Sequence, residues 1–243
     1  MSTEPAPDLT VIVPCYREGP TLPESLRRVT DWLERRGLPW ELLLIDDASP
    51  DGTRALADAF VAAHPELPLR TAHHAVNTGR GGAVADGLRL ARGRLAGFLD
   101  IDLEISEQAI GPCLDALEAG ADLVVGRRRY VLAAHSLGRH VLSRGYARLV
   151  AALLGTRLHD TESGCKWFRR AAIVPLLDRV ADRGWFFDTE ICVRAERAGL
   201  AVAEVPVDFV RRFDKPSTVR PLRDSLVYLL ALLRFRARLA RGG

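Results

Sequence analysis

The chain has 243 residues, 48% of them hydrophobic and 27% charged, so it can build one large α/β domain and disorder is not expected. Its net charge of +3 is too small to indicate nucleic-acid binding by itself. The 4 cysteines form no CxxC pair, which argues against a cysteine metal site and a disulfide framework and favours reduced thiols.

The first half alternates short apolar runs with amphipathic stretches, which is typical of βαβ units and a mainly parallel sheet. The expected strands are Leu9–Val13, Glu41–Ile45, Leu69–Ala72, Leu95–Leu99 and Leu123–Val125. The expected helices between them are Thr21–Arg36, Thr53–Ala63, Gly81–Ala91 and Glu107–Ala119. Each of the first four strands runs into a polar or glycine-containing turn. Because ligands bind outside the carboxyl ends of strands in open α/β sheets, we expect these turns to form one site.

The second half predicts helices over Ser136–Leu154 and Asp188–Ala198 and a late strand over Val202–Val207. From Arg220 to Arg241 a stripe of leucines runs beside several arginines, which predicts a basic amphipathic helix. The sequence contains no internal repeat and no Gly/Ser-rich linker. We therefore expect one α/β domain over residues 1–218 and a helical appendage over residues 219–243.

The turn Asp100-Ile101-Asp102 follows an apolar strand and brings two carboxylates to its end. Hard oxygen ligands suit Mg²⁺ or Mn²⁺, which are often held by one or two carboxylates together with substrate phosphates. Glu104 lies two residues further on and is a candidate for a third oxygen ligand. A short acidic turn is weak evidence alone, but its position in step with the other turns favours a metal site.

Two further turns carry candidate binding groups. Asp46 and Asp47 follow an apolar strand, where acids can accept hydrogen bonds from a base edge or from ribose hydroxyls. The segment Asn77–Ala83 is rich in glycine and opens a helix, so its backbone N–H groups and Arg80 can contact a diphosphate.

Together these segments resemble the family 2 glycosyltransferases of GT-A fold, and most closely the dolichyl- or polyprenyl-phosphate mannose and glucose synthases. The resemblance spans about residues 8 to 218 in the order of the family's motifs. The matching segments are Val13–Glu18, Ile45–Thr53, Asn77–Ala83, Leu99–Glu104, Val125–Arg128, Asp160–Arg169, Trp185–Ile191 and Val205–Val207.

The resemblance implies a nucleotide-sugar half at about residues 8–126 and an acceptor half at about residues 127–218. The residues implied to bind the nucleotide-sugar are Pro14, Tyr16, Glu18, Asp46, Asp47, Asn77, Arg80, Gly81, Asp100 and Ile101. The implied metal ligands are Asp100, Asp102 and Glu104. The residues implied for catalysis are Asp160, Arg128, Arg139 and Asp188, and those for the acceptor phosphate are Arg128, Arg139 and Lys215.

Several positions depart from the family pattern. Arg80 replaces the usual lysine and Glu104 the usual glutamine, while Glu162 and Trp167 stand at variable positions. The usual late Ser-Lys is replaced by the segment 213–217, which contains Lys215.

The implied reaction is metal-dependent transfer of a hexose, with inversion, from a UDP- or GDP-linked sugar to a polyprenyl phosphate. A phosphate acceptor needs orientation by arginines, whereas a small hydroxyl-bearing acceptor, the alternative, needs a general base. Asp160 is the first candidate for that base and Asp188 the second. A non-catalytic nucleotide-sugar-binding subunit and a nucleotidyltransferase are both less favoured, because the metal acids are intact and no basic glycine-rich loop follows the first strand.

No secretory signal follows Met1, and charges interrupt every apolar run before the ~20 residues that a spanning helix needs. We therefore expect a cytoplasmic protein. Its C-terminal helix has three candidate positions: peripherally on the inner face of a membrane, on its own domain, or on a partner helix.

Overall fold

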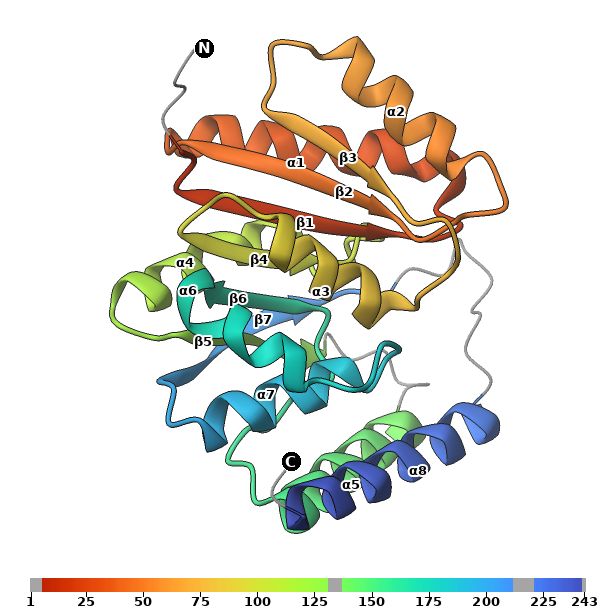
Figure 1. The fold of residues 1–243 in the computed structure, drawn as a ribbon, viewed down its shortest axis with the longest axis vertical. Helices are drawn as coiled ribbons and strands as arrows, with labels where there is room; N and C mark the ends of the chain where they lie inside the picture. The colour runs from red at the N-terminus through yellow and green to blue at the C-terminus, as the bar shows by residue number, and fades with distance from the viewer. Residues whose placement is uncertain (1–5, 131–136, 212–220, 242–243) are drawn as a thin grey trace.

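The structure, a computed structural model, describes residues 6–130, 137–211 and 221–241. Its centre is a seven-stranded sheet in the order β3-β2-β1-β4-β6-β5-β7 (Figure 1). The strands are β1 Leu9–Cys15, β2 Trp40–Asp46, β3 Leu69–His73, β4 Leu95–Leu99, β5 Leu123–Tyr130, β6 Cys165–Arg169 and β7 Val202–Phe209. The α/β class and the mainly parallel sheet expected from the sequence are confirmed.

All strands except β6 run in one direction, since β6 pairs antiparallel with both β4 and β5 while the other pairs are parallel. The carboxyl ends of six strands therefore meet at one edge of the sheet. The loop before β6 reaches the same edge, because an antiparallel strand starts where its neighbours end. This edge collects polar segments from both halves of the chain.

Helices cover both faces of the sheet (Figure 1). Their bounds are α1 Leu22–Arg36, α2 Thr53–Ala63, α3 Arg80–Leu90, α4 Ile110–Glu118, α5 Leu137–Leu154, α6 Arg170–Ile173, α7 Phe187–Arg197 and α8 Pro221–Ala240. One core joins the sheet to α1, α2 and α4, and another joins it to α3, α6 and α7. Both faces of β1 and β2 are buried, which explains their near-continuous apolar sequences.

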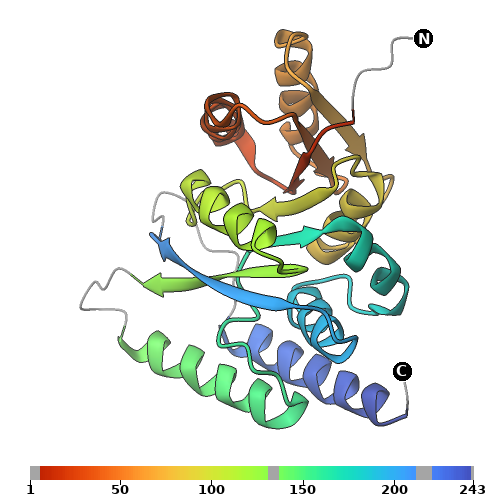
Figure 2. The same cartoon turned by 90° about the vertical axis from the view of Figure 1, so that its left-hand side faces the viewer.

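Helices α5 and α8 lie side by side at one end of the molecule (Figures 1 and 2). A third core joins them to α7, and Leu232 and Phe235 of α8 are completely buried in it. Three positions were considered for the C-terminal helix. The face of α8 that carries Leu232 and Phe235 packs on the protein's own domain. None of the helices in the described part of the chain combines the length and apolar character that crossing a membrane requires.

The expected helices lie close to their observed positions: Thr53–Ala63 matches α2, and the observed α1 begins one residue later than expected. The stretch expected as one helix over Glu107–Ala119 is a 3-10 turn, Glu107–Ala109, followed by α4. Two more 3-10 segments, Gly19–Thr21 and Val174–Arg179, were not expected. Strand β6 was not expected either. The division between residues 1–218 and 219–243 stays a prediction.

Candidate active site

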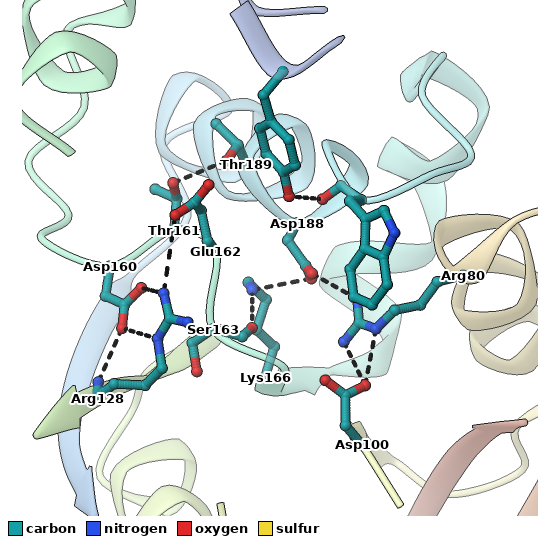
Figure 3. Close-up of polar contacts among 12 residues, drawn as sticks. Arg80, Asp100, Arg128, Asp160, Thr161, Glu162, Ser163, Lys166, Asp188 and Thr189 are labelled. Atoms are coloured by element: carbon teal, nitrogen blue, oxygen red, sulfur yellow. Dashed lines mark hydrogen bonds and ion pairs between the residues drawn. The ribbon is translucent and has the colours of Figure 1, made fainter. Parts of the chain in front are cut away.

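Charged side chains from four segments meet at the carboxyl edge of the sheet (Figure 3). Asp100 directly follows β4, and Arg80 begins α3. Lys166 comes from β6 and Asp188 from the first turn of α7. In open α/β sheets, ligands bind outside the carboxyl ends of the strands at the point where the chain connections diverge, and the strand order places β1 and β4 side by side.

These four side chains form a chain of ion pairs in which positive and negative groups alternate, from Lys166 through Asp188 and Arg80 to Asp100. Lys166 Nζ donates to Asp188 Oδ1 at 3.0 Å, and Arg80 Nη1 donates to Asp188 Oδ2 at 2.6 Å. Arg80 Nε donates to Asp100 Oδ1 at 2.8 Å. The Lys166 side chain is completely buried and that of Asp188 is 2% exposed, so each charge depends on its partners. Figure 3 shows Arg80 between the two carboxylates.

Aromatic rings hold the Arg80 guanidinium on two sides. Its Cζ lies 5.1 Å from the ring centroid of Phe98 and 5.2 Å from that of Trp185. Burial opposes the charge, but Asp100 and Asp188 keep the pKa of Arg80 above its ordinary value. Arg80 Nη2 is buried and has no hydrogen-bond partner among the described residues, although it lies 2.8 Å from Asp100 Oδ1. The guanidinium therefore faces Asp100 with two of its nitrogens, Nε and Nη2.

The Asp100 carboxylate is confined by its surroundings. Burial raises its pKa to about 6; Arg80 opposes this shift, while the negative charges of Asp102 and Asp188 add to it. A Cβ at Gly164 would overlap the Asp100 carboxylate, so a larger residue there would displace this side chain. Glycine therefore allows the loop before β6 to approach the carboxylate closely.

Asp100 and Asp102 provide an oxygen donor set that suits a divalent cation only in part. Among the described residues, no three histidine, cysteine or acidic side chains form a group able to hold a metal ion. The expected trio with Glu104 is thus not assembled in this arrangement. Two carboxylates that leave most positions to substrate phosphates and water do match the way Mg²⁺ is commonly bound. The residues therefore fit a cation that is shared with a diphosphate.

Near the carboxyl end of β5, Arg128 and Asp160 form a two-pronged ion pair (Figure 3). Arg128 Nε and Nη2 donate to the two carboxylate oxygens at 2.8 and 2.7 Å, and the Arg128 backbone N–H adds a bond of 2.9 Å. Glu162 Oε2 lies 3.9 Å from Arg128 Nη2. Burial raises the pKa of Glu162 to about 7 against the attraction of Arg128.

Asp47 organises the loop that opens α3. Its carboxylate accepts hydrogen bonds from the backbone N–H groups of Thr78 and Gly79 at 2.7 and 2.8 Å, from the Thr78 hydroxyl, and from His74 at 2.7 Å. Burial opposes its charge, but these bonds hold the pKa of Asp47 below its usual value. Asn77 Nδ2 also donates to the Asp47 carbonyl oxygen at 3.1 Å. The structure thus shows Asp47 stabilising the loop before α3, whereas contact of Asp47 with a nucleoside stays a prediction.

The other residues expected at the nucleoside lie on or next to this edge. Pro14 is buried within β1, Tyr16 is 43% exposed beyond it, and Asp46 ends β2 with only 2% exposure. The Glu18 backbone N–H donates to the Thr53 hydroxyl at 2.9 Å, which ties the loop after β1 to the start of α2.

Four other predicted positions have different surroundings. Ile101 is buried in the core, so its side chain faces away from the edge. Gly81 packs on α7, where an added Cβ would overlap that of Phe187. Arg139 belongs to α5, but its side chain lies outside the described residues, as does the whole of Lys215.

Sequence reasoning assigned no role to several side chains at this edge. Lys166 and Gly164 lay within a matching segment, but nothing in the sequence pairs them with α7 or β4. Trp185 is 58% exposed, and its ring lies over the Arg80 guanidinium. The Tyr228 hydroxyl of α8 donates to the Trp185 carbonyl at 2.9 Å, a link between distant segments that no sequence pattern indicated.

A mainly parallel α/β sheet with two acids and an arginine at the end of β4 defines a GT-A-type glycosyltransferase. The chain belongs to the family "Glycosyl transferase family 2", whose model matches residues 10–176. The sequence-based assignment to this family, and to enzymes of this class, is confirmed.

Two related sequences match a larger part of the chain than the family model does. Glycosyltransferase AglD of Haloferax volcanii is 34% identical over 225 residues, which cover 90% of this chain and 35% of AglD. The chain thus spans about a third of that relative. Polyprenol monophosphomannose synthase of Mycolicibacterium smegmatis is 33% identical over 220 residues, covering 87% of this chain and 80% of the relative.

A solved structure shares the fold at lower identity. Glucosyl-3-phosphoglycerate synthase of Mycobacterium tuberculosis, in complex with Mn²⁺, UDP and glucosyl-3-phosphoglycerate, superposes with a TM-score of 0.69. It is 20% identical, and the match covers 95% of this chain and 80% of that one. At this identity the likeness supports the GT-A-like fold.

Proposed function

We propose that this protein transfers a hexose from a UDP- or GDP-linked sugar to a polyprenyl phosphate, with Mg²⁺ or Mn²⁺ as cofactor. The observation that carries the proposal is the pair Asp100 and Asp102 at the end of β4, with Arg80 bound against the first of them. Relatives named for polyprenol phosphate, and a neighbour that holds Mn²⁺ and UDP, support the substrates and the ion.

Asp100 and Asp102 would hold the cation together with the donor's diphosphate. When bound, a divalent ion supplies neutralisation of the charge that develops on the leaving nucleoside diphosphate. Arg80 adds a fixed positive charge directly beside Asp100. Asp188 and the two aromatic rings fix the position of the guanidinium, so that it needs little reorganisation during the reaction.

A phosphate acceptor fits the charge arrangement better than a hydroxyl acceptor. An oxygen of the acceptor phosphate would attack the anomeric carbon, forming the new C–O bond as the bond to the diphosphate breaks, with inversion. This attack needs no base. Both carboxylates considered as bases are committed to cations, Asp160 to Arg128 and Asp188 to Arg80 and Lys166. Among the cations in the described part of the chain, Arg128 is the candidate for orienting the acceptor phosphate. Arg139 and Lys215 stay proposed to bind the same phosphate.

The outer face of α8 supports a peripheral membrane contact, which would bring the site to its lipid acceptor. Opposite the buried Leu232 and Phe235, this helix exposes Leu226, Val227, Leu230 and Leu233. Exposed arginines accompany this strip at positions 234, 236 and 241. An apolar strip beside arginines is the pattern of helices that lie on anionic bilayers.

Vesicle sedimentation tests the membrane contact. We expect the protein to sediment with vesicles that contain phosphatidylglycerol and to remain in the supernatant with pure phosphatidylcholine. The double variant Leu226→Glu/Leu233→Glu should lose sedimentation, whereas Leu90→Glu, at an exposed leucine of α3, should keep it. Equal sedimentation of the two variants would contradict this role of α8.

The transfer itself is tested by turnover. Purified protein is incubated with UDP- and GDP-linked hexoses, with or without a short polyprenyl phosphate, in Mg²⁺ or Mn²⁺. We expect lipid-dependent release of nucleoside diphosphate from one donor, and loss of this release in Asp102→Asn. Turnover with a hydroxyl compound but not with the lipid phosphate would contradict the acceptor and favour the alternative function.

A further inference from the structure

Glu162 lies beside the Arg128–Asp160 pair, on the loop that leads into β6 (Figure 3). Its Oε2 is 3.9 Å from Arg128 Nη2, and its side chain is 27% exposed. Asp160 accepts three hydrogen bonds of 2.7–2.9 Å from Arg128, whereas the Glu162 contact with the guanidinium is longer, at 3.9 Å. Glu162 is thus the less firmly held of the two acids that face the arginine.

The charges around Glu162 come from four elements. Arg128 belongs to β5, Asp160 to the same loop, Lys166 to β6 and Asp188 to α7. The two cations favour the carboxylate, while the two acids and burial disfavour it, with burial the largest effect. The result is a pKa of about 7, so both protonation states are populated near neutral pH.

An anion that approaches Arg128 meets Glu162. Asp160 already occupies Nε and Nη2 on one edge of the guanidinium. The Glu162 oxygen is near that same Nη2, so a phosphate bound to Arg128 would have the Glu162 carboxyl as a neighbour. An ionised carboxylate repels the phosphate, whereas a protonated one can donate a hydrogen bond to it.

We propose that Glu162 binds the acceptor phosphate as the neutral acid, its O–H donating to a phosphate oxygen beside Arg128. This inference rests on the proposed function and adds to it a second group that holds the acceptor phosphate. The proton stays on Glu162 throughout, because the attacking phosphate oxygen needs no base. As pH rises above 7, Glu162 ionises and the acceptor is bound less tightly.

Steady-state kinetics between pH 6 and pH 8.5 test this role. The KM for a short polyprenyl phosphate is measured at saturating donor for the wild type, Glu162→Gln and Glu66→Gln, which alters an exposed acid far along the chain. With a pKa of about 7, the wild-type KM should rise about tenfold from pH 6 to pH 8, relative to Glu162→Gln. The glutamine amide donates at every pH, so its KM at pH 8 should be about tenfold below the wild-type value. Ionisation of the acceptor phosphate itself, near pH 6, affects all three proteins equally.

The outcomes separate the two proposals. Parallel pH profiles for wild type and Glu162→Gln would overturn the role of Glu162 while leaving phosphate transfer intact. A fall in kcat with unchanged KM in Glu162→Gln would also overturn it, since that result assigns a base. Absence of wild-type transfer to any lipid phosphate would overturn the proposed function and this inference with it. Thermal melting confirms that Glu162→Gln is folded, and Glu162→Asp, which keeps the carboxyl, should retain the pH dependence.

Discussion

Asp188 is the carboxylate on which two buried cations depend, and Asp188→Asn removes its charge with little change of shape. In the wild type this carboxylate accepts hydrogen bonds from Lys166 at 3.0 Å and from Arg80 at 2.6 Å. In the variant Lys166, which has no exposed surface, becomes an uncompensated buried cation. Arg80 keeps Asp100 as a partner.

Breaking a buried ion pair by removing one partner costs about 3–5 kcal/mol. Each kcal/mol lowers Tm by about 2–4 °C for a chain of this size, so Asp188→Asn should melt about 6–20 °C below the wild type. The matched control is Asp178→Asn. Asp178 bonds Arg89 at 2.8 Å, but its side chain is 83% exposed, so the loss should stay below about 1 kcal/mol.

The assay is urea unfolding of both variants, of Lys166→Met and of the double variant Lys166→Met/Asp188→Asn. If the buried lysine causes the loss, the double variant should be about 2 kcal/mol more stable than Asp188→Asn. Asp188→Asn within 1 kcal/mol of the wild type would refute the reasoning, and so would a double variant less stable than Asp188→Asn. An inactive but fully stable Asp188→Asn would instead favour a base at this position.

Three other changes have defined outcomes. Asp102→Asn should lower kcat/KM about 100-fold or more, and EDTA should abolish wild-type turnover until Mn²⁺ or Mg²⁺ is restored; EDTA-resistant turnover would contradict a metal role. Asp47→Asn should cost about 1.5–3 kcal/mol of stability at pH 7. Hydrogen bonds lower the pKa of Asp47 in the folded state. The stability that its carboxylate contributes is therefore complete above about pH 4 and is lost as pH falls through the lowered pKa. A difference in unfolding free energy between wild type and Asp47→Asn that does not change with pH would contradict this. Tyr228→Phe removes the bond to the Trp185 carbonyl and should lower the unfolding free energy by about 1 kcal/mol, whereas an unchanged urea midpoint would contradict a stabilising link.

Local sequence patterns were sufficient for the helices and for most strands. Helix α2 was placed correctly because its apolar spacing and the turn before it are local features. Strand β6 was missed because its five residues include Lys166 and Arg169, which are atypical of a central strand. What buries it is pairing with β4 and β5, from distant parts of the chain. Tertiary context decided the outcome there.

The sequence predicted where the site lies better than it predicted which side chains contact one another there. Turns at the ends of parallel strands must converge, so the sequence could bring Asp100 and Arg80 to one edge. It could not reveal that Asp188 pairs with Arg80 across 108 positions, or that Asp160 pairs with Arg128 across 32. Both acids were therefore considered as bases, whereas the structure pairs each with a cation.

The most direct test of the central claim is product analysis of one reaction that contains a nucleotide-linked hexose, a short polyprenyl phosphate and Mn²⁺. We expect mass spectrometry to detect a hexose joined through the lipid phosphate, formed in equal amount to the released nucleoside diphosphate and absent from Asp102→Asn. Nucleoside diphosphate release without any glycosylated lipid, at every donor tested, would contradict the claim that the site joins a sugar to a lipid phosphate.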